Sequence, residues 1–150
     1  MDKKEVTQKF WSEWLTVDMV IFTVDQGELK VLLVKRVNEP FKGMWALPGG
    51  FLCKGERLEG AASRVLKEKA GIKNVYLEQL YTFDKKGRDP RGDVITVSYF
   101  ALFPIEDLDI ADQKDGGVQL FALDKLPKLG FDHKEIIEYA KIRLQYKLEY

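Results

Sequence analysis

The sequence predicts an α/β protein in which a mixed β-sheet lies between helices, an α/β/α sandwich. Runs rich in β-branched residues predict strands on both sides of the middle of the chain. Residues 57–70 instead repeat apolar side chains at helical spacing, and a second helix start follows near residue 131. Strands, a helix, further strands and a final helix, in that order, are typical of a sheet covered by helices.

The first part of the chain predicts one helix and a β-hairpin. The segments expected to be regular before residue 50 are a short helix at 5–14 and strands at 15–24, 29–35 and 45–47. The aromatic side chains of the short helix would serve as core cover, as a dimer surface or as a wall for a ligand. The strand at 45–47 is expected to stop at Pro48, before a glycine turn at 49–50.

Residues 57–70 predict the central helix, and the residues after it predict how the helix ends. Gly71 is the glycine that a left-handed helix ending favours. Ile72 then stands where it would contact Leu66, as a Schellman ending prefers.

The second half of the chain predicts three strands and a closing helix. The strands are expected at 74–83, 94–103 and 118–123. Asp132 and Glu135 match a capping box, so a helix is expected from this point to about residue 147. His133 lies beside the predicted cap, and we assign it a structural role.

Length and composition limit the classes of protein to consider. At 150 residues we expect a single domain over residues 1–150. Lys and Arg together number 24, as do Asp and Glu, so the chain as a whole has no excess charge to attract nucleic acid or a membrane. One cysteine, Cys53, excludes an internal disulfide, and the sequence has neither a signal peptide nor a membrane-spanning apolar run. We therefore expect a cytoplasmic protein.

Residues 49–72, called the box below, carry the most specific pattern in the chain. They resemble the Nudix box, G-x5-E-x7-R-E-U-x-E-E-x-G-U with U a bulky apolar residue, at Gly50, Glu56, Arg64, Leu66, Glu68, Gly71 and Ile72. The resemblance covers nearly the whole chain and implies the Nudix fold and a pyrophosphohydrolase that uses Mg²⁺. It also implies that Glu56 and Arg64 pair to brace the loop against the helix, and that Glu68 and the carbonyl of Gly49 bind the metal.

Two positions of the box depart from the pattern. Val65 and Lys69 stand where the pattern has glutamates. A helix would present the side chains of Val65, Glu68 and Lys69 on one face, so only one carboxylate remains there. A metal site is therefore weakened, and carboxylates that could complete it from elsewhere are Glu59, Asp112 and Asp115.

Lys69 also suggests a different chemistry. An ammonium group repels a metal ion but suits direct contact with a pyrophosphate. We hypothesise that Lys69 takes the place of the metal, so that the domain binds phosphate without efficient hydrolysis. The alternative is that the charges on this helix are merely solvated and salt-bridged.

Other segments resemble the branch of the Nudix family that recognises ADP-ribose. These segments are residues 80–83, 88–92, 97–102 and 130–137. Residues 66–71 are similar to the degenerate box of Nudix-related transcriptional regulators, in which the domain senses ADP-ribose or a related ligand and a following winged helix binds DNA. The sequence ends where that second module would begin, so we expect no contact with nucleic acid through this chain alone.

Arginine and aromatic side chains are the candidates for ligand contacts beside Lys69. Arg88 and Arg91 lie in a loop with proline and glycine, where guanidinium groups could bind a pyrophosphate, although an exposed turn is the alternative. Arg36 ends a strand near the box. An adenine is expected to stack on one of three rings, Phe41, Trp45 or Tyr81.

Two main interpretations of the function follow, and a third is a purely structural dimerisation unit. The first is a domain that binds ADP-ribose or another nucleoside-diphosphate-linked ligand, with a degenerate active site and no required cofactor. The second is a working Mg²⁺-dependent ADP-ribose pyrophosphatase, in which Glu68, Glu56 and Arg64 act with carboxylates outside the helix. In both, the partner is a small nucleotide, no membrane is involved, and the resemblance implies a homodimer.

Overall fold

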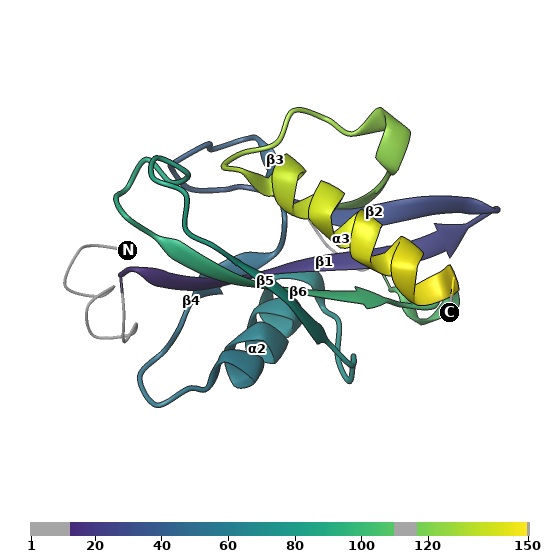
Figure 1. Ribbon diagram of the computed structural model, residues 1–150, viewed down its shortest axis with the longest axis horizontal. Helices are drawn as coiled ribbons and strands as arrows, with labels where there is room; N and C mark the ends of the chain where they lie inside the picture. The colour runs from purple at the N-terminus through teal and green to yellow at the C-terminus, as the bar shows by residue number, and fades with distance from the viewer. Residues whose placement is uncertain (1–12, 110–116, 150) are drawn as a thin grey trace.

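A computed structural model describes residues 13–109 and 117–149 of the protein. Within these residues one sheet has seven strands: β1 (Leu15–Asp25), β2 (Glu28–Lys35), β3 (Trp45–Ala46), β4 (Gly49–Phe51), β5 (Glu78–Phe83), β6 (Ile95–Leu102) and β7 (Val118–Ala122). Two α-helices accompany it, α2 (Leu58–Ala70) and α3 (His133–Glu149), with short 3-10 turns η1 (Ile105–Asp107) and η2 (Leu123–Lys125) (Figure 1).

The sheet is mixed because its two central strands run parallel. β1 pairs with β6 in parallel from Leu15 opposite Ile95 to Phe22 opposite Leu102. The other pairs of named strands are antiparallel, and they give the order β3-β2-β1-β6-β5, with β4 joined to β1 and β7 joined to β2. The predicted hairpin is formed by β1 and β2.

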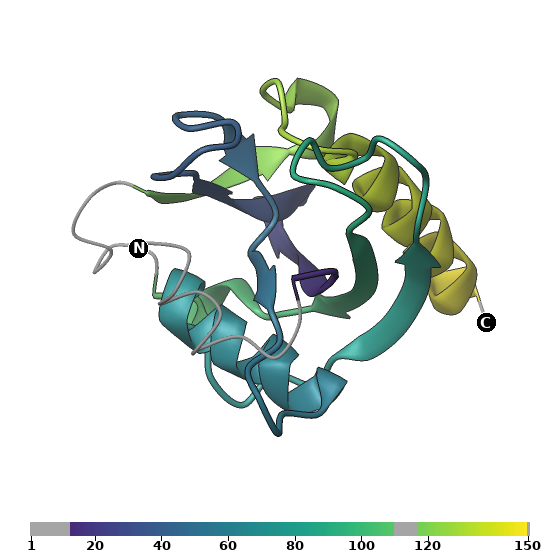
Figure 2. The ribbon, with the colours of Figure 1, turned by 90° about the vertical axis from the view of Figure 1, so that its left-hand side faces the viewer.

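The two helices cover opposite faces of the sheet (Figure 2). Val17 and Met19 of β1 lie in the core cluster that α2 completes, whereas Val20 and Phe22 lie in the cluster that α3 completes. Because both faces of β1 are buried, its sequence is an almost continuous apolar run instead of an alternation. The predicted α/β/α sandwich is confirmed.

Helix α2 runs as predicted and ends at the predicted left-handed glycine. Its buried face is made by small and apolar side chains, Ala61, Ala62, Val65, Leu66 and Ala70. Gly71 has a left-handed φ of 69°, its N–H donates to the carbonyl of Lys67 at 3.1 Å, and the N–H of Ile72 donates to Leu66 at 3.3 Å. The bond from Gly71 to Lys67 is the 5→1 bond of an αL ending, so the left-handed glycine is confirmed, whereas the pair of bonds that defines the expected Schellman ending is not the pair observed.

Several predicted boundaries need correction. The glycine turn expected at 49–50 is the start of strand β4, because a glycine lets the backbone approach β1: a Cβ on Gly49 would lie 2.0 Å from Oδ1 of Asp18. β5 begins at Glu78 instead of residue 74, since Asn74 has a left-handed φ of 56° that no strand accepts.

The N-terminal helix expected at 5–14 falls mostly outside the described residues, and Glu13 and Trp14 are not helical. The closing helix continues to Glu149, slightly beyond its expected end. None of the helices in the described part of the chain is long and apolar enough to span a bilayer.

The left-handed end of α2 predicts opposite effects for two glycine substitutions. Gly71→Ala should lower the free energy of unfolding by about 1 kcal/mol, because an alanine is strained at this φ. Gly60→Ala, on the same helix, should raise it by about 0.5 kcal/mol, because alanine favours the helix and an added Cβ would meet no atom within 4 Å. Urea unfolding of both variants measures the difference, and equal effects would contradict this account of the helix end.

Candidate functional site

The candidate site is a pocket of about 650 Å³ between the box, residues 88–94 and the start of α3. This volume is in the range of small-molecule sites. The cationic side chains that line the pocket are Arg36, Arg64, Lys69, Arg88 and Arg91. The acidic side chains that line it are Glu13, Asp18, Glu39, Glu68 and Asp89.

The box folds around one arginine. Arg64 donates from Nε to Glu56 at 2.7 Å and from Nη2 to the same carboxylate at 3.0 Å, and it also donates to the carbonyl of Phe51 at 2.9 Å. The hydrogen bond from Arg64 is the main reason why the pKa of Glu56 lies below its usual value. The predicted brace between the loop and α2 is therefore confirmed.

Glu68, the one carboxylate among residues 65, 68 and 69 of α2, also bonds to this arginine. Nη1 of Arg64 donates to its Oε2 at 3.1 Å. Gly49, the other predicted metal ligand, lines the pocket and packs against Asp18.

The donors at this site do not fit a magnesium ion, which prefers several oxygen ligands. Val65 brings no oxygen and is buried against Gly50, while Lys69 brings a positive charge. Within the residues that the structure describes, no group of three or more His, Cys, Asp or Glu side chains could hold a metal. Glu59 does not line the pocket, and Asp112 and Asp115 lie outside the described residues.

Among the described cationic side chains that line the pocket, Lys69 and Arg36 are the two that have no ion-pair partner. No carboxylate among the described residues lies within ion-pairing distance of either side chain. Lys69 keeps solvent-exposed surface, yet the surrounding protein crowds its ammonium and lowers its pKa, and Arg36 lowers that pKa further. Burial and then Arg91 likewise lower the pKa of Arg36. Burial and neighbouring cations therefore disfavour the charged forms of Lys69 and Arg36, and an anionic ligand would stabilise them.

Arg91 is held in place by its own loop. Its Nε and Nη2 donate to the two carboxylate oxygens of Asp89 at 3.0 and 2.7 Å. Burial alone would raise the pKa of Asp89, but the hydrogen bonds from Arg91 bring it below its usual value. The guanidinium itself remains partly exposed in the pocket, so it can reach a ligand.

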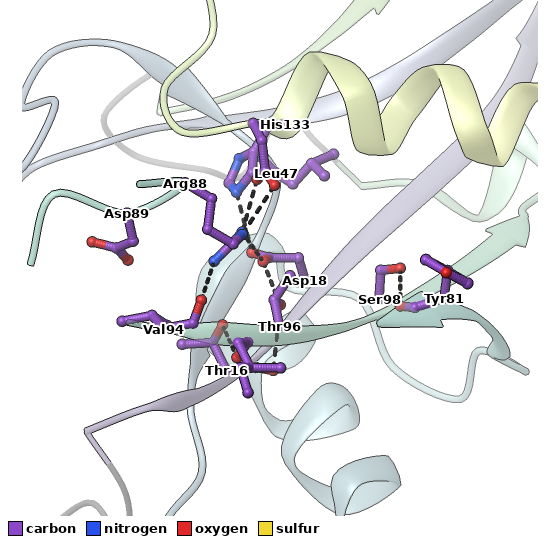
Figure 3. Close-up of polar contacts among 12 residues, drawn as sticks. Thr16, Asp18, Leu47, Tyr81, Arg88, Asp89, Val94, Thr96, Ser98 and His133 are labelled. Atoms are coloured by element: carbon purple, nitrogen blue, oxygen red, sulfur yellow. Dashed lines mark hydrogen bonds and ion pairs between the residues drawn. The ribbon is translucent and has the colours of Figure 1, made fainter. Parts of the chain in front are cut away.

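Arg88, in contrast, is buried in a polar network beneath the pocket (Figure 3). Nε and Nη2 donate to both oxygens of Asp132 at 3.0 and 2.8 Å, and Nη1 donates to the carbonyl of Val94 at 3.2 Å. Its side chain is 3% exposed. The contact of Arg88 with a ligand stays a prediction: the side chain lines the pocket, but its bonds to Asp132 and Val94 already use it to anchor the loop. Asp132, expected to cap α3, is the partner of this anchor.

Asp18 and His133 complete the network from β1 and the start of α3. Asp18 accepts a hydrogen bond from the hydroxyl of Thr96 at 2.6 Å, and its Oδ2 lies 3.8 Å from Arg88. Nδ1 of His133 accepts the N–H of Leu47 at 2.9 Å, so the ring proton belongs on Nε2, which lies 3.4 Å from Asp18. Burial lowers the pKa of His133. The structural role predicted for His133 thus includes shaping the floor of the pocket.

The three rings predicted to stack on an adenine do not line the pocket. Trp45 packs edge-on against Phe121, and Tyr81 stacks on Tyr139 of α3 with centroids 5.0 Å apart. Phe41 supports the pocket indirectly through its edge contact with Phe131. The aromatic side chains that do line it are Trp14, Phe51 and Phe131.

The sequence did not indicate that the side chains of Asp18, Asp89 and Phe131 line the pocket. It also did not indicate that Asp132 pairs with Arg88. For Asp18 a signal was present: it is the one charged residue inside the apolar run of β1, and a buried carboxylate needs partners. For Phe131 no local pattern reveals that it faces the pocket.

The geometry of the box and the fold agree with comparisons to known proteins. The NUDIX domain model matches residues 14–140, so this chain belongs to the NUDIX family. The ADPR responsive transcriptional repressor NtrR of Acinetobacter baylyi is 43% identical over 143 residues, which cover 93% of this chain and 57% of the relative. An ADP-ribose pyrophosphatase of Methanocaldococcus jannaschii is 41% identical, over 73% of this chain and 64% of the relative.

A solved structure is similar over nearly the whole chain. It is the NUDIX domain of Shewanella oneidensis NrtR complexed with ADP ribose, with a TM-score of 0.78, 40% identity, and coverage of 96% of this chain and 99% of that chain. This chain spans less than two thirds of the length of the two curated relatives.

The buried neutral His133 predicts a pH-dependent stability. Its pKa is lowered in the folded protein, so below about pH 6.5 the unfolded chain takes up the proton first. The contribution of His133 is therefore complete above that pH and is lost as the pH falls. His133→Gln should flatten the loss of unfolding free energy between pH 7 and 5, by up to about 1.4 kcal/mol per pH unit. Urea unfolding at several pH values tests this, and parallel curves for both proteins would contradict it.

Proposed function

We propose that this domain binds ADP-ribose, or a closely related nucleoside-diphosphate-linked ligand, in the pocket beside the box. The observation that carries the proposal is the set of cations in the pocket, of which Lys69 and Arg36 lack an ion-pair partner among the described residues. A pyrophosphate is a compact dianion, and it would supply the charge that these side chains lack. The similarity to a NUDIX domain complexed with ADP ribose supports the same ligand.

We also propose that hydrolysis by this site is weak. Lys69 and Val65 replace two carboxylates, and the ammonium of Lys69 would neutralise the pyrophosphate without activating water. The family generally uses Mg²⁺ for that activation, because a bound metal lowers the pKa of its water. A pocket that binds but does not cleave suits a sensor, in line with the repressor relative.

A second candidate function is an active Mg²⁺-dependent ADP-ribose pyrophosphatase. Two observations favour it: the bonded set of Glu56, Arg64 and Glu68 is retained, and one relative is an ADP-ribose pyrophosphatase. This function would require oxygen ligands from outside the described residues, where Asp112 and Asp115 lie.

We also propose three further properties that the sequence predicts. They are a single domain over residues 1–150, a homodimer and a cytoplasmic location. The balanced charge of the chain supports assigning it a small-molecule partner and no direct contact with nucleic acid.

Titration calorimetry with ADP-ribose, with and without Mg²⁺, tests the proposed function. The expected result is binding in both conditions, with the ligand recovered intact, because Lys69 replaces the metal. Product analysis of the same samples provides the second measurement. AMP and ribose phosphate that appear only with Mg²⁺ would establish the pyrophosphatase instead, and no binding would overturn the proposed ligand.

Lys69 provides a matched pair of variants. Lys69→Met should weaken ADP-ribose binding roughly tenfold or more, because it removes a charge-assisted bond to phosphate. Lys67→Met changes the same residue type two positions away, where the side chain is exposed and does not line the pocket, and it should leave the affinity unchanged. Equal affinities for both variants would show that Lys69 does not contact the ligand.

A further inference from the structure

Phe131 lies two residues before His133, the first residue of α3, and has an unusual backbone conformation. It has a left-handed φ of 56°, which is rare for a residue with a bulky side chain, and it lines the pocket. Phe41 packs edge-on against its ring at a centroid distance of 4.8 Å, and His133 lies 5.0 Å away. The ring is therefore fixed in direction by its neighbours, as a recognition surface must be.

Two arginines of the pocket lie over this ring. The guanidinium carbon of Arg36 is 4.9 Å from the ring centroid, and that of Arg91 is 5.6 Å from it. Arg91 also lies 4.8 Å from the ring centroid of Phe51 on β4. Arg91 contacts these rings while it is bonded to Asp89, whereas Arg36, whose Nε donates to the carbonyl of Pro40 at 2.6 Å, lies over Phe131 with no carboxylate partner among the described residues. The two like charges repel each other.

A pyrophosphate would change this arrangement. A charge-assisted hydrogen bond to phosphate is stronger than a cation–π contact at a partly exposed site, so Arg36 would move from the ring towards the phosphates, while Arg91 stays bonded to Asp89. The ring face that Arg36 leaves is flat, apolar and already oriented. A nucleobase is the part of a nucleoside diphosphate that such a face would bind, because every base has a π-face.

We propose that Phe131 is the residue that stacks on the nucleobase of the ligand, and that Arg36 leaves its ring to bind the pyrophosphate. This inference rests on the proposed function and names the residue that distinguishes a nucleoside diphosphate from a simple phosphate. It replaces Phe41, Trp45 and Tyr81, none of which lines the pocket.

The test compares ADP-ribose with inorganic pyrophosphate, which has no base, by titration calorimetry. Phe131→Leu keeps an apolar side chain but removes the π-face, so it should weaken ADP-ribose binding roughly 5- to 100-fold and leave pyrophosphate binding unchanged. Phe131→Trp should restore the affinity for ADP-ribose. Tyr81→Leu is the matched control, because it removes an aromatic ring outside the pocket and should change neither affinity.

The outcomes separate this inference from the proposed function. An equal loss for both ligands in Phe131→Leu would overturn the inference, since the ring would then act only by positioning the arginines. Unchanged binding of ADP-ribose in that variant, or a loss in Tyr81→Leu alone, would overturn it as well. If the unaltered protein binds pyrophosphate but not ADP-ribose, the proposed function fails and the inference fails with it.

Discussion

The pocket of this protein depends on a buried pair of carboxylates and the arginine between them. Burying the carboxylates of Asp18 and Asp132 costs several kcal/mol per ion unless each is paired with an opposite charge. The guanidinium of Arg88 lies within ion-pairing distance of both. Through these contacts β1, the loop after β5 and the start of α3 are joined at one point below the ligand site (Figure 3). The floor thus carries two carboxylates that share one guanidinium, and above it Lys69 and Arg36 have no ion-pair partner among the described residues.

Charge balance explains how one scaffold could bind a nucleotide without cleaving it. A hydrolytic site places carboxylates around a metal, and the metal then neutralises the pyrophosphate. Here an amine at residue 69 and a valine at residue 65 leave a site whose own side chains carry the positive charge. The loop brace made by Glu56 and Arg64 is retained, because it stabilises the fold whether or not water is activated. Fold and chemistry are therefore separable at two positions of α2.

The relatives share the family of this chain, and they include proteins of both candidate functions, ligand binding and hydrolysis. One relative is a repressor that responds to ADPR and another is a pyrophosphatase, at similar identity to this chain. Overall similarity therefore does not separate binding from hydrolysis. The distinction lies in a few side chains around the pocket, and the electrostatics of Lys69 and Arg36 favour binding.

Local patterns in the sequence determined the hairpin, the extent of α2 and its left-handed glycine ending, because each depends on residues close together in the chain. The pairing of Glu56 with Arg64 was implied by the resemblance to the Nudix box. The burial of Arg88, the partners of Asp18 and the exclusion of Tyr81 from the pocket were decided by the tertiary structure. Arg88 is 44 residues from Asp132, Thr96 is 78 from Asp18, and Leu47 is 86 from His133. Such pairs form only when the sheet register and the position of α3 bring them together, and no local pattern records that geometry.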